Sequence, residues 1–158
     1  MRRLSMLAFV LVLGVMLVGS AIGADQAKDT QALVEKGVAM VKAKGVDATL
    51  KAIGDKKGPF VKGDLYLFAG PLDKTTLSAH PMKPALAGKD LSKTKDKATD
   101  PKKAKLLFVD FVKVAKGSGK GWVEYWWPKP GATKPSLKRT YIMRVPGQNL
   151  YIAAGYYK

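Results

Sequence analysis

The sequence predicts an α+β domain in which a long N-terminal helix packs on a five-stranded antiparallel sheet, with a helix and a loop between strands two and three. Three observations support this fold class. Apolar residues recur at helical spacing before residue 54, and short aromatic and β-branched segments bounded by Gly and Pro follow residue 58. The last two segments are joined only by residues 146–149, a length typical of an antiparallel hairpin.

Residues 1–24 have the features of a secretory signal peptide. Two arginines at the start are followed by an apolar stretch over 6–18 and a small-residue exit over 19–24. We expect cleavage near residue 24, a periplasmic or secreted location, and a single mature domain over 25–158. The alternative is an uncleaved segment that anchors the protein to the membrane, although 6–18 is shorter than a typical span.

Two helices are expected before the sheet. The first covers 25–44, where Leu33, Val34, Val38 and Val41 lie at helical spacing, and Gly45 ends it. Asp47 is placed to cap a second, shorter helix that runs to Ile53. A Gly-Pro-Phe turn at residues 58–60 then separates these N-terminal helices, 25–54, from the sheet-forming part, 58–158.

Five strands are predicted from the aromatic and β-branched segments: 65–69, 75–79, 121–127, 137–145 and 150–157. An irregular stretch with two prolines covers 80–100. A helix is expected over 101–116, because Pro101 suits a first helical turn and Gly117 suits a helix end.

Several short motifs occur in an order that resembles a known family. They are 58–60 (Gly-Pro-Phe), 63–66 (Gly-Asp-Leu-Tyr), 80–81 (His-Pro), 86–91 (Leu-Ala-Gly-Lys-Asp-Leu), 121–125 (Gly-Trp-Val-Glu-Tyr), 127–131 (Trp-Pro-Lys-Pro-Gly), Lys138, 140–141 (Thr-Tyr) and 155–157 (Gly-Tyr-Tyr). The set resembles a single Cache domain of the second type, a PAS-like domain of bacterial chemoreceptors and histidine kinases that also occurs as free-standing exported proteins. The resemblance covers nearly the whole predicted mature chain and implies an extracytoplasmic sensor that binds a small molecule.

The pattern departs from the family at two places. The turn over 70–75 replaces the usual Asp-Gly hairpin between the first two strands. Receptors of the family continue past the last strand into a second membrane span, whereas this sequence stops at Lys158. We therefore expect it to act without a signalling module of its own, with a membrane receptor or kinase as a possible partner. The N-terminal helix is a candidate surface for a homodimer.

The formal net charge is +16, with 28 Lys and Arg against 12 Asp and Glu. Such a charge attracts anions. The bases are scattered, without the aromatic interleaving typical of RNA binding, so we expect no nucleic-acid partner. The alternative to ligand sensing is a basic protein that binds the anionic envelope surface and uses the Cache fold only as a scaffold.

Aromatic residues of the third strand are the first candidates for a ligand pocket. Alternation places Val123, Tyr125 and Trp127 on one face and residues 122, 124 and 126 on the other. Aromatic rings with polar tips suit a small ligand. The competing interpretation is that these rings simply fill the core of a domain without cysteine.

Lys138 and Tyr141 of the fourth strand are candidates for binding a carboxylate. Because they are three residues apart, a bulge would be needed to point both inward. The resemblance supports Lys138, and Arg139, which shares the parity of Tyr141, is its competitor. His80, the only histidine, precedes Pro81 at the end of the predicted second strand, and the resemblance places it toward the pocket.

Enzymatic chemistry is not indicated. One histidine and no cysteine cannot form the usual zinc site, the serines stand in no nucleophile motif, and no glycine-rich phosphate loop follows a strand. The acids show no calcium-loop spacing. We therefore expect no cofactor and no metal. The predicted ligand is a small anionic metabolite, most simply a carboxylate, and the predicted site residues are His80, Tyr125, Trp127, Lys138 and Tyr141.

Overall fold

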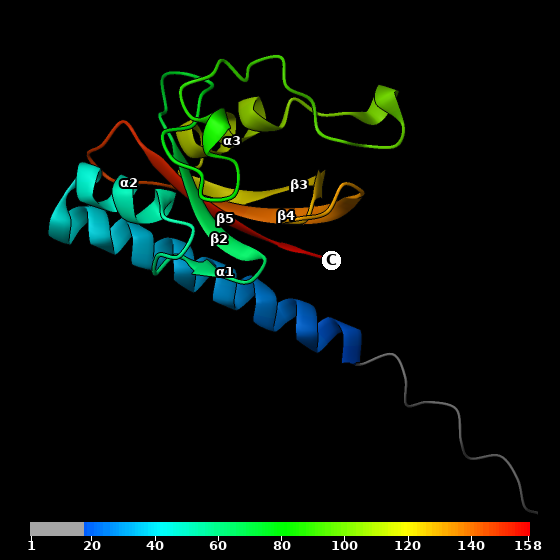
Figure 1. Cartoon of the computed structure of the whole chain (residues 1–158), viewed down its shortest axis with the longest axis horizontal. Coiled ribbons are helices and arrows are strands. Elements are labelled where there is room, and N and C mark those ends of the chain that lie inside the picture. Colours follow the sequence, from blue (N-terminus) through cyan, green and yellow to red (C-terminus); the bar gives the residue numbers. More distant parts are fainter. Residues whose placement is uncertain (1–17) are drawn as a thin grey trace, which may run out of the picture.

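The computed structural model describes residues 18–158, which form three layers (Figure 1). Two helices cover one face of an antiparallel sheet, and a third helix with long loops covers the other. This arrangement confirms the predicted α+β fold. Most of the segment interpreted as a signal peptide, residues 1–17, lies outside the described residues. Within the described part, none of the helices combines the length and the apolar character needed to cross a membrane.

The first layer consists of α1 (Val18–Lys44) and α2 (Val46–Gly54). A buried stripe on α1, formed by Thr30, Val34, Gly37 and Val41, faces the sheet. Gly37 permits the close approach, because a Cβ there would lie 2.7 Å from Cδ1 of Leu67. Gly45, at φ +83°, separates the helices and precedes α2. Asp47 does not cap α2 as expected, because it already lies in the first turn of the helix.

The sheet has the strand order β1-β2-β5-β4-β3, with every neighbouring pair antiparallel. Its strands are β1 (Val61–Lys62), β2 (Leu65–Gly70), β3 (Lys120–Pro128), β4 (Pro135–Arg144) and β5 (Tyr151–Tyr157). The hairpin predicted for the last two strands is therefore confirmed. Strand β5 lies at the centre of the sheet and all seven of its residues are buried.

The predicted strand over 75–79 is wrong. These residues form only isolated bridges, Ala69 with Ala79 and Leu77 with Ala87. Their backbone groups bond partly to β2 and partly to the following loop, where the N–H of Gly88 donates to the carbonyl of Leu77. The segment therefore joins the loop to the sheet without adding a strand. The fifth strand of the sheet is instead the short strand β1.

The helix predicted over 101–116 is interrupted. A 3-10 turn spans Pro101–Lys103 and α3 spans Leu107–Lys116. Between them, the backbone of Lys105 exchanges hydrogen bonds with Asp96 instead of continuing a helix: its carbonyl accepts from the Asp96 N–H at 2.8 Å, and its N–H donates to Asp96 Oδ1 at 3.0 Å. Non-local bonding thus replaces helical bonding at this point.

Two apolar cores result, one on each side of the sheet. The core under α1 and α2 is mainly aliphatic. The core under α3 is rich in aromatic rings, including Phe68, Phe108, Phe111 and Tyr125. This aromatic side also contains the buried histidine and lysine.

Candidate ligand-binding site

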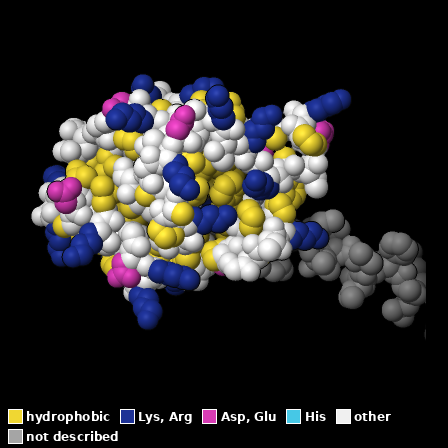
Figure 2. Space-filling view, turned by 45° about the horizontal axis from the view of Figure 1, so that its top comes forward, with side chains coloured by type: hydrophobic (Ala, Val, Ile, Leu, Met, Phe, Trp, Pro, Cys, Tyr) yellow, Lys and Arg dark blue, Asp and Glu magenta, His cyan; other side chains and the backbone are white. Residues whose placement is uncertain are grey.

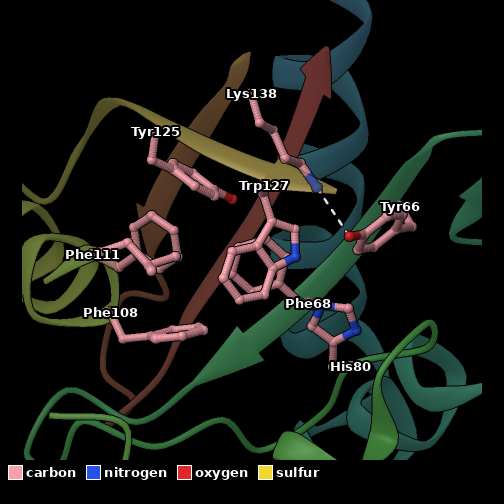
Figure 3. Close-up of a pocket in the computed structure, with 9 residues that line it drawn as sticks. Tyr66, Phe68, His80, Phe108, Phe111, Tyr125, Trp127 and Lys138 are labelled. Carbon is pink, nitrogen blue, oxygen red and sulfur yellow. Dashed lines mark hydrogen bonds between the residues drawn. The ribbon is translucent and has the colours of Figure 1, made fainter. Parts of the chain in front are cut away.

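Antiparallel pairing in the sheet brings the candidate residues together. Tyr125 of β3 is opposite Lys138 of β4, and Lys138 is in turn opposite Tyr157 of β5. Trp127 follows two residues after Tyr125 on the same face, and His80 approaches this face from the loop after β2 (Figure 3). Four of the five predicted residues, His80, Tyr125, Trp127 and Lys138, therefore line one cavity.

Lys138 is the most unusual residue of the cavity, because its cationic side chain is only 1% exposed. Nζ donates to the hydroxyl of Tyr66 at 3.0 Å and lies 4.2 Å and 4.8 Å from the ring centres of Tyr66 and Tyr157. The ion pairs found among residues 18–158 do not include it. Burial, helped by the charge of Lys83 and opposed by Asp64, lowers the pKa of Lys138 to about 7. A buried ammonium of this kind gains strongly from an anionic partner.

Gly155 makes room for the lysine stem. It lies on β5 opposite Thr140, two residues along the strands from the Lys138–Tyr157 pair. A Cβ at this position would overlap the Thr140 hydroxyl and lie 2.9 Å from Cε of Lys138. It would also lie 2.8 Å from the backbone oxygen of Arg139, which cannot move without disturbing the strand pair. The absence of a side chain at 155 thus allows the side chain of Lys138 to extend over the central strand β5 toward Tyr66 of β2.

His80 is held as a neutral side chain. Its Nδ1 accepts a hydrogen bond from the N–H of Lys83 at 2.9 Å, and its ring stacks on Phe68 at 5.7 Å between centres. Burial, together with the positive charges of Lys138 and Lys83, lowers the pKa of His80 to about 3. Because Nδ1 accepts, the proton of the neutral ring is on Nε2, which makes Nε2 a donor.

Tyr125 and Trp127 form the aromatic wall. The hydroxyl of Tyr125 hydrogen-bonds with Oγ1 of Thr140 at 3.0 Å, and burial raises the pKa of Tyr125. The Trp127 ring packs edge-on against Phe108 of α3. Nζ of Lys83 lies 4.6 Å from the centre of the Trp127 ring.

The cavity is small and enclosed. The volume open to the centre of a water-sized sphere is about 10 Å³, roughly one water molecule. Five lining residues were not singled out from the sequence: Tyr66, Phe68, Leu107, Phe108 and Phe111. Tyr66 belongs to a motif of the family resemblance, and the other four look like ordinary apolar positions of β2 and α3.

Tyr141 does not share this site. It lies on the opposite face of the sheet, where its ring packs 5.0 Å from that of Trp122. Arg139 is on the same face, with Nε 3.6 Å from Glu124 Oε1. Strands β3 and β4 pair without a bulge, so a separation of three residues puts Lys138 and Tyr141 on different faces. The placement of Tyr141 at the pocket is thus wrong, and Lys138, not Arg139, points into the cavity.

Comparison with known proteins supports the family resemblance. A family model described as a Cache domain matches residues 50–158. The methyl-accepting chemotaxis protein McpP of Pseudomonas putida is 35% identical over 78 residues, which are 49% of this chain and 13% of that protein. The chain thus matches only a small part of this curated relative.

Solved structures show the same fold. The periplasmic sensor domain of a chemotaxis protein is 28% identical with a TM-score of 0.64, over 91% of this chain and 99% of that one. A Cache chemosensory domain studied for carboxylic acid recognition is 24% identical with a TM-score of 0.66, over 87% and 97% of the chains. A methyl-accepting chemotaxis protein from Vibrio parahaemolyticus is 22% identical with a TM-score of 0.69, over 87% and 92%.

Proposed function

The chain belongs to the Cache domain family, and from this premise we propose that it is an extracytoplasmic domain that reversibly binds a small carboxylate at Lys138. The observation that carries the proposal is a fully buried ammonium whose partner is a neutral phenol rather than a carboxylate. The carboxylic acid recognition described for one similar Cache chemosensory domain supports the same ligand class.

In this proposal the carboxylate accepts hydrogen bonds from Nζ of Lys138 and from the Nε2–H of His80. Charge-assisted bonds of this kind are the stronger ones in proteins, and the enclosed aromatic surroundings strengthen them further. Tyr125 and Trp127 contact the apolar part of the ligand. Because the cavity now has room for about one water molecule, ligand entry requires the lining to widen.

The extracytoplasmic location is also part of the proposal. It rests on the signal-like features of residues 1–24 and on the periplasmic sensor domain among the similar structures. Intact mass of the protein recovered from cells distinguishes the two alternatives for this segment. A mature form starting near Asp25 supports cleavage, and a full-length form retained in membranes after an alkaline wash supports an anchor.

Calorimetric titration with short monocarboxylic acids, such as acetate and propionate, tests the ligand class. Replacing Lys138 with Met keeps most of the buried stem and removes the charge. We expect Lys138→Met to weaken the acid that binds best by about tenfold to a hundredfold, corresponding to the ~1.5–3 kcal/mol of a charge-assisted bond. Tyr141→Phe, on the opposite face, is the control and keeps the parent affinity. Unchanged affinity of the Lys138→Met variant contradicts the proposal.

A further inference from the structure

A second hollow lies beside the cavity, on the other side of Tyr66. This outer cleft has a volume of about 110 Å³ by the same measure and is lined by Lys56, Tyr66, Met82, Lys83 and residues 128–132. Besides Tyr66 of β2, three separate parts of the chain contribute to it: the connection after α2, the loop after His80, and the end of β3 with the turn that follows it. Tyr66 lines both spaces, so the two are adjacent at this residue.

The charged residues of the outer cleft are all cationic. Among the described residues, 18–158, Lys56, Lys83 and Lys129 line it, and no aspartate or glutamate does. Within the same part of the chain, the lining of the cavity behind Tyr66 includes Lys138 and His80 and no acid. A different hollow near α1 also includes Lys129, but it contains Asp29 and Asp64. Among these three spaces, the outer cleft and the cavity are thus the two whose charged or basic lining residues are all lysine or histidine.

Two outer lysines contact the aromatic rings that also enclose Lys138. Nζ of Lys83 lies 4.6 Å from the ring centre of Trp127, which lines the cavity. Nζ of Lys129 lies 5.6 Å from the ring centre of Tyr157, and Nζ of Lys138 lies 4.8 Å from that ring. Lys129 and Lys138 thus contact the same ring, and Lys83 contacts a ring that lines the cavity of Lys138.

The size of the cavity limits what can lie against Lys138. A space of about one water molecule can widen to take a carboxylate, but the rest of a larger ligand has to extend past Tyr66. There it reaches Lys83 and Lys129. A neutral apolar tail gains little among these ammonium groups, whereas a second carboxylate finds two partners.

We propose that the cavity and the outer cleft form one site for a small dicarboxylate, with one carboxylate on Lys138 and the other on Lys83 and Lys129. This inference rests on the proposed function and narrows its ligand class. The outer lysines are largely exposed, so their contribution is weaker than that of Lys138.

The test compares acids of equal carbon number that differ in the second carboxylate, such as butyrate with succinate and valerate with glutarate. By calorimetry we expect the better dicarboxylate to bind about threefold to tenfold more tightly than its monocarboxylate counterpart. The double variant Lys83→Met/Lys129→Met keeps both aliphatic stems and should lose this preference. It should not weaken the monocarboxylate, because the charge of Lys83 lowers the pKa of Lys138 and its removal favours the ammonium form. Lys113→Met/Lys116→Met on α3 removes the same charge elsewhere and should change nothing.

The outcomes separate the two proposals. If monocarboxylates bind as tightly as dicarboxylates, and binding depends on Lys138 but not on Lys83 and Lys129, the dicarboxylate inference is wrong and the proposed function stands. Equal weakening by the two double variants would show a general charge effect and also overturn the inference. If Lys138→Met binds both acid types like the parent, the proposed function itself fails.

Discussion

Among single residues, Lys138 is the one whose lowered pKa links both the stability of the fold and the proposed carboxylate binding to pH. Burial lowers its pKa from 10.5 to about 7 in the folded protein. Between these two values the unfolded chain binds more protons than the folded one, so stability rises with pH across this window. Below pH 7 both states are protonated, and the cost of burying the charge is present in full.

We predict two opposite pH effects from this shift. The free energy of unfolding should increase between about pH 7 and 9.5, by at most ~1.4 kcal/mol per pH unit. Affinity for a carboxylate should fall above pH 7, by up to about tenfold per unit, because the free protein loses the ammonium. Urea unfolding and calorimetric titration at a series of pH values measure both. In the Lys138→Met variant, neither the free energy of unfolding nor the carboxylate affinity should show this dependence on pH. If the variant keeps both pH dependences, other titrating groups cause them.

The choice between Lys138 and Arg139 shows how far the sequence can specify a site. Alternation indicates which residues of a strand share a face, but it does not indicate which face carries the pocket. The family resemblance favoured Lys138, and the pairing of Tyr125 with Lys138 places it there. Tyr141 differs in parity from Lys138, so a regular strand without a bulge cannot point both side chains into one pocket.

At the scale of secondary structure elements, the loop around Asp96 protects the edge of the sheet. Asp96 Oδ2 accepts from the N–H of Trp126 at 2.9 Å, and its Oδ1 accepts from the N–H of Lys105. The N–H of Lys97 also donates to the carbonyl of Trp126. Edge strand β3 therefore has part of its free backbone covered by this loop.

Replacing Asp96 by Asn tests this role. The amide can accept only one of the two bonds and places an NH2 group against the other backbone N–H. We expect Asp96→Asn to lower the free energy of unfolding by ~1–3 kcal/mol, because the side chain is buried. Chemical denaturation measures the change. Asp110→Asn, on the exposed side of α3, should cost less than ~0.5 kcal/mol, and equal effects of the two variants would contradict the edge role.

The irregular segments between β2 and α3 explain which elements could be predicted from the sequence and which could not. Strands β3, β4 and β5 have alternating or continuous apolar patterns and pair with their neighbours in the chain, so local signals were sufficient. Residues 75–79 have a strand-like composition, but their backbone partners are divided between Ala69 of β2 and the loop over 87–91. Lys105 interrupts a helical pattern through its bonds to Asp96. Neither long-range partner leaves a signal in the local sequence.

At the scale of the whole molecule, positively charged side chains are distributed over the surface and are not concentrated in one patch. Figure 2 shows Lys and Arg side chains distributed over the visible face, with few acids among them. The net charge of +16 favours association with anionic surfaces in general. This distribution keeps the envelope-surface alternative open beside ligand binding.

Salt concentration distinguishes the two proposals, carboxylate binding in the cavity and adsorption to an anionic surface. Between about 0.05 and 0.5 M NaCl we expect adsorption to vesicles with anionic lipid to fall steeply, because exposed charges are screened. Affinity for a monocarboxylate in the enclosed cavity should change by less than about threefold. Vesicle sedimentation and calorimetric titration over the same salt series provide the comparison. A ligand affinity that falls in parallel with vesicle binding would place the carboxylate on the surface instead.

Gly155 on β5 has a consequence for how the buried cation and the strand pairing depend on each other. Its missing side chain decides how far the ammonium of Lys138 extends across the sheet. A single methyl group here would meet the Lys138 stem, the Thr140 hydroxyl and a backbone oxygen of β4 at once. The depth of the buried cation and the spacing of the two paired strands thus depend on one position, and neither can change there without the other.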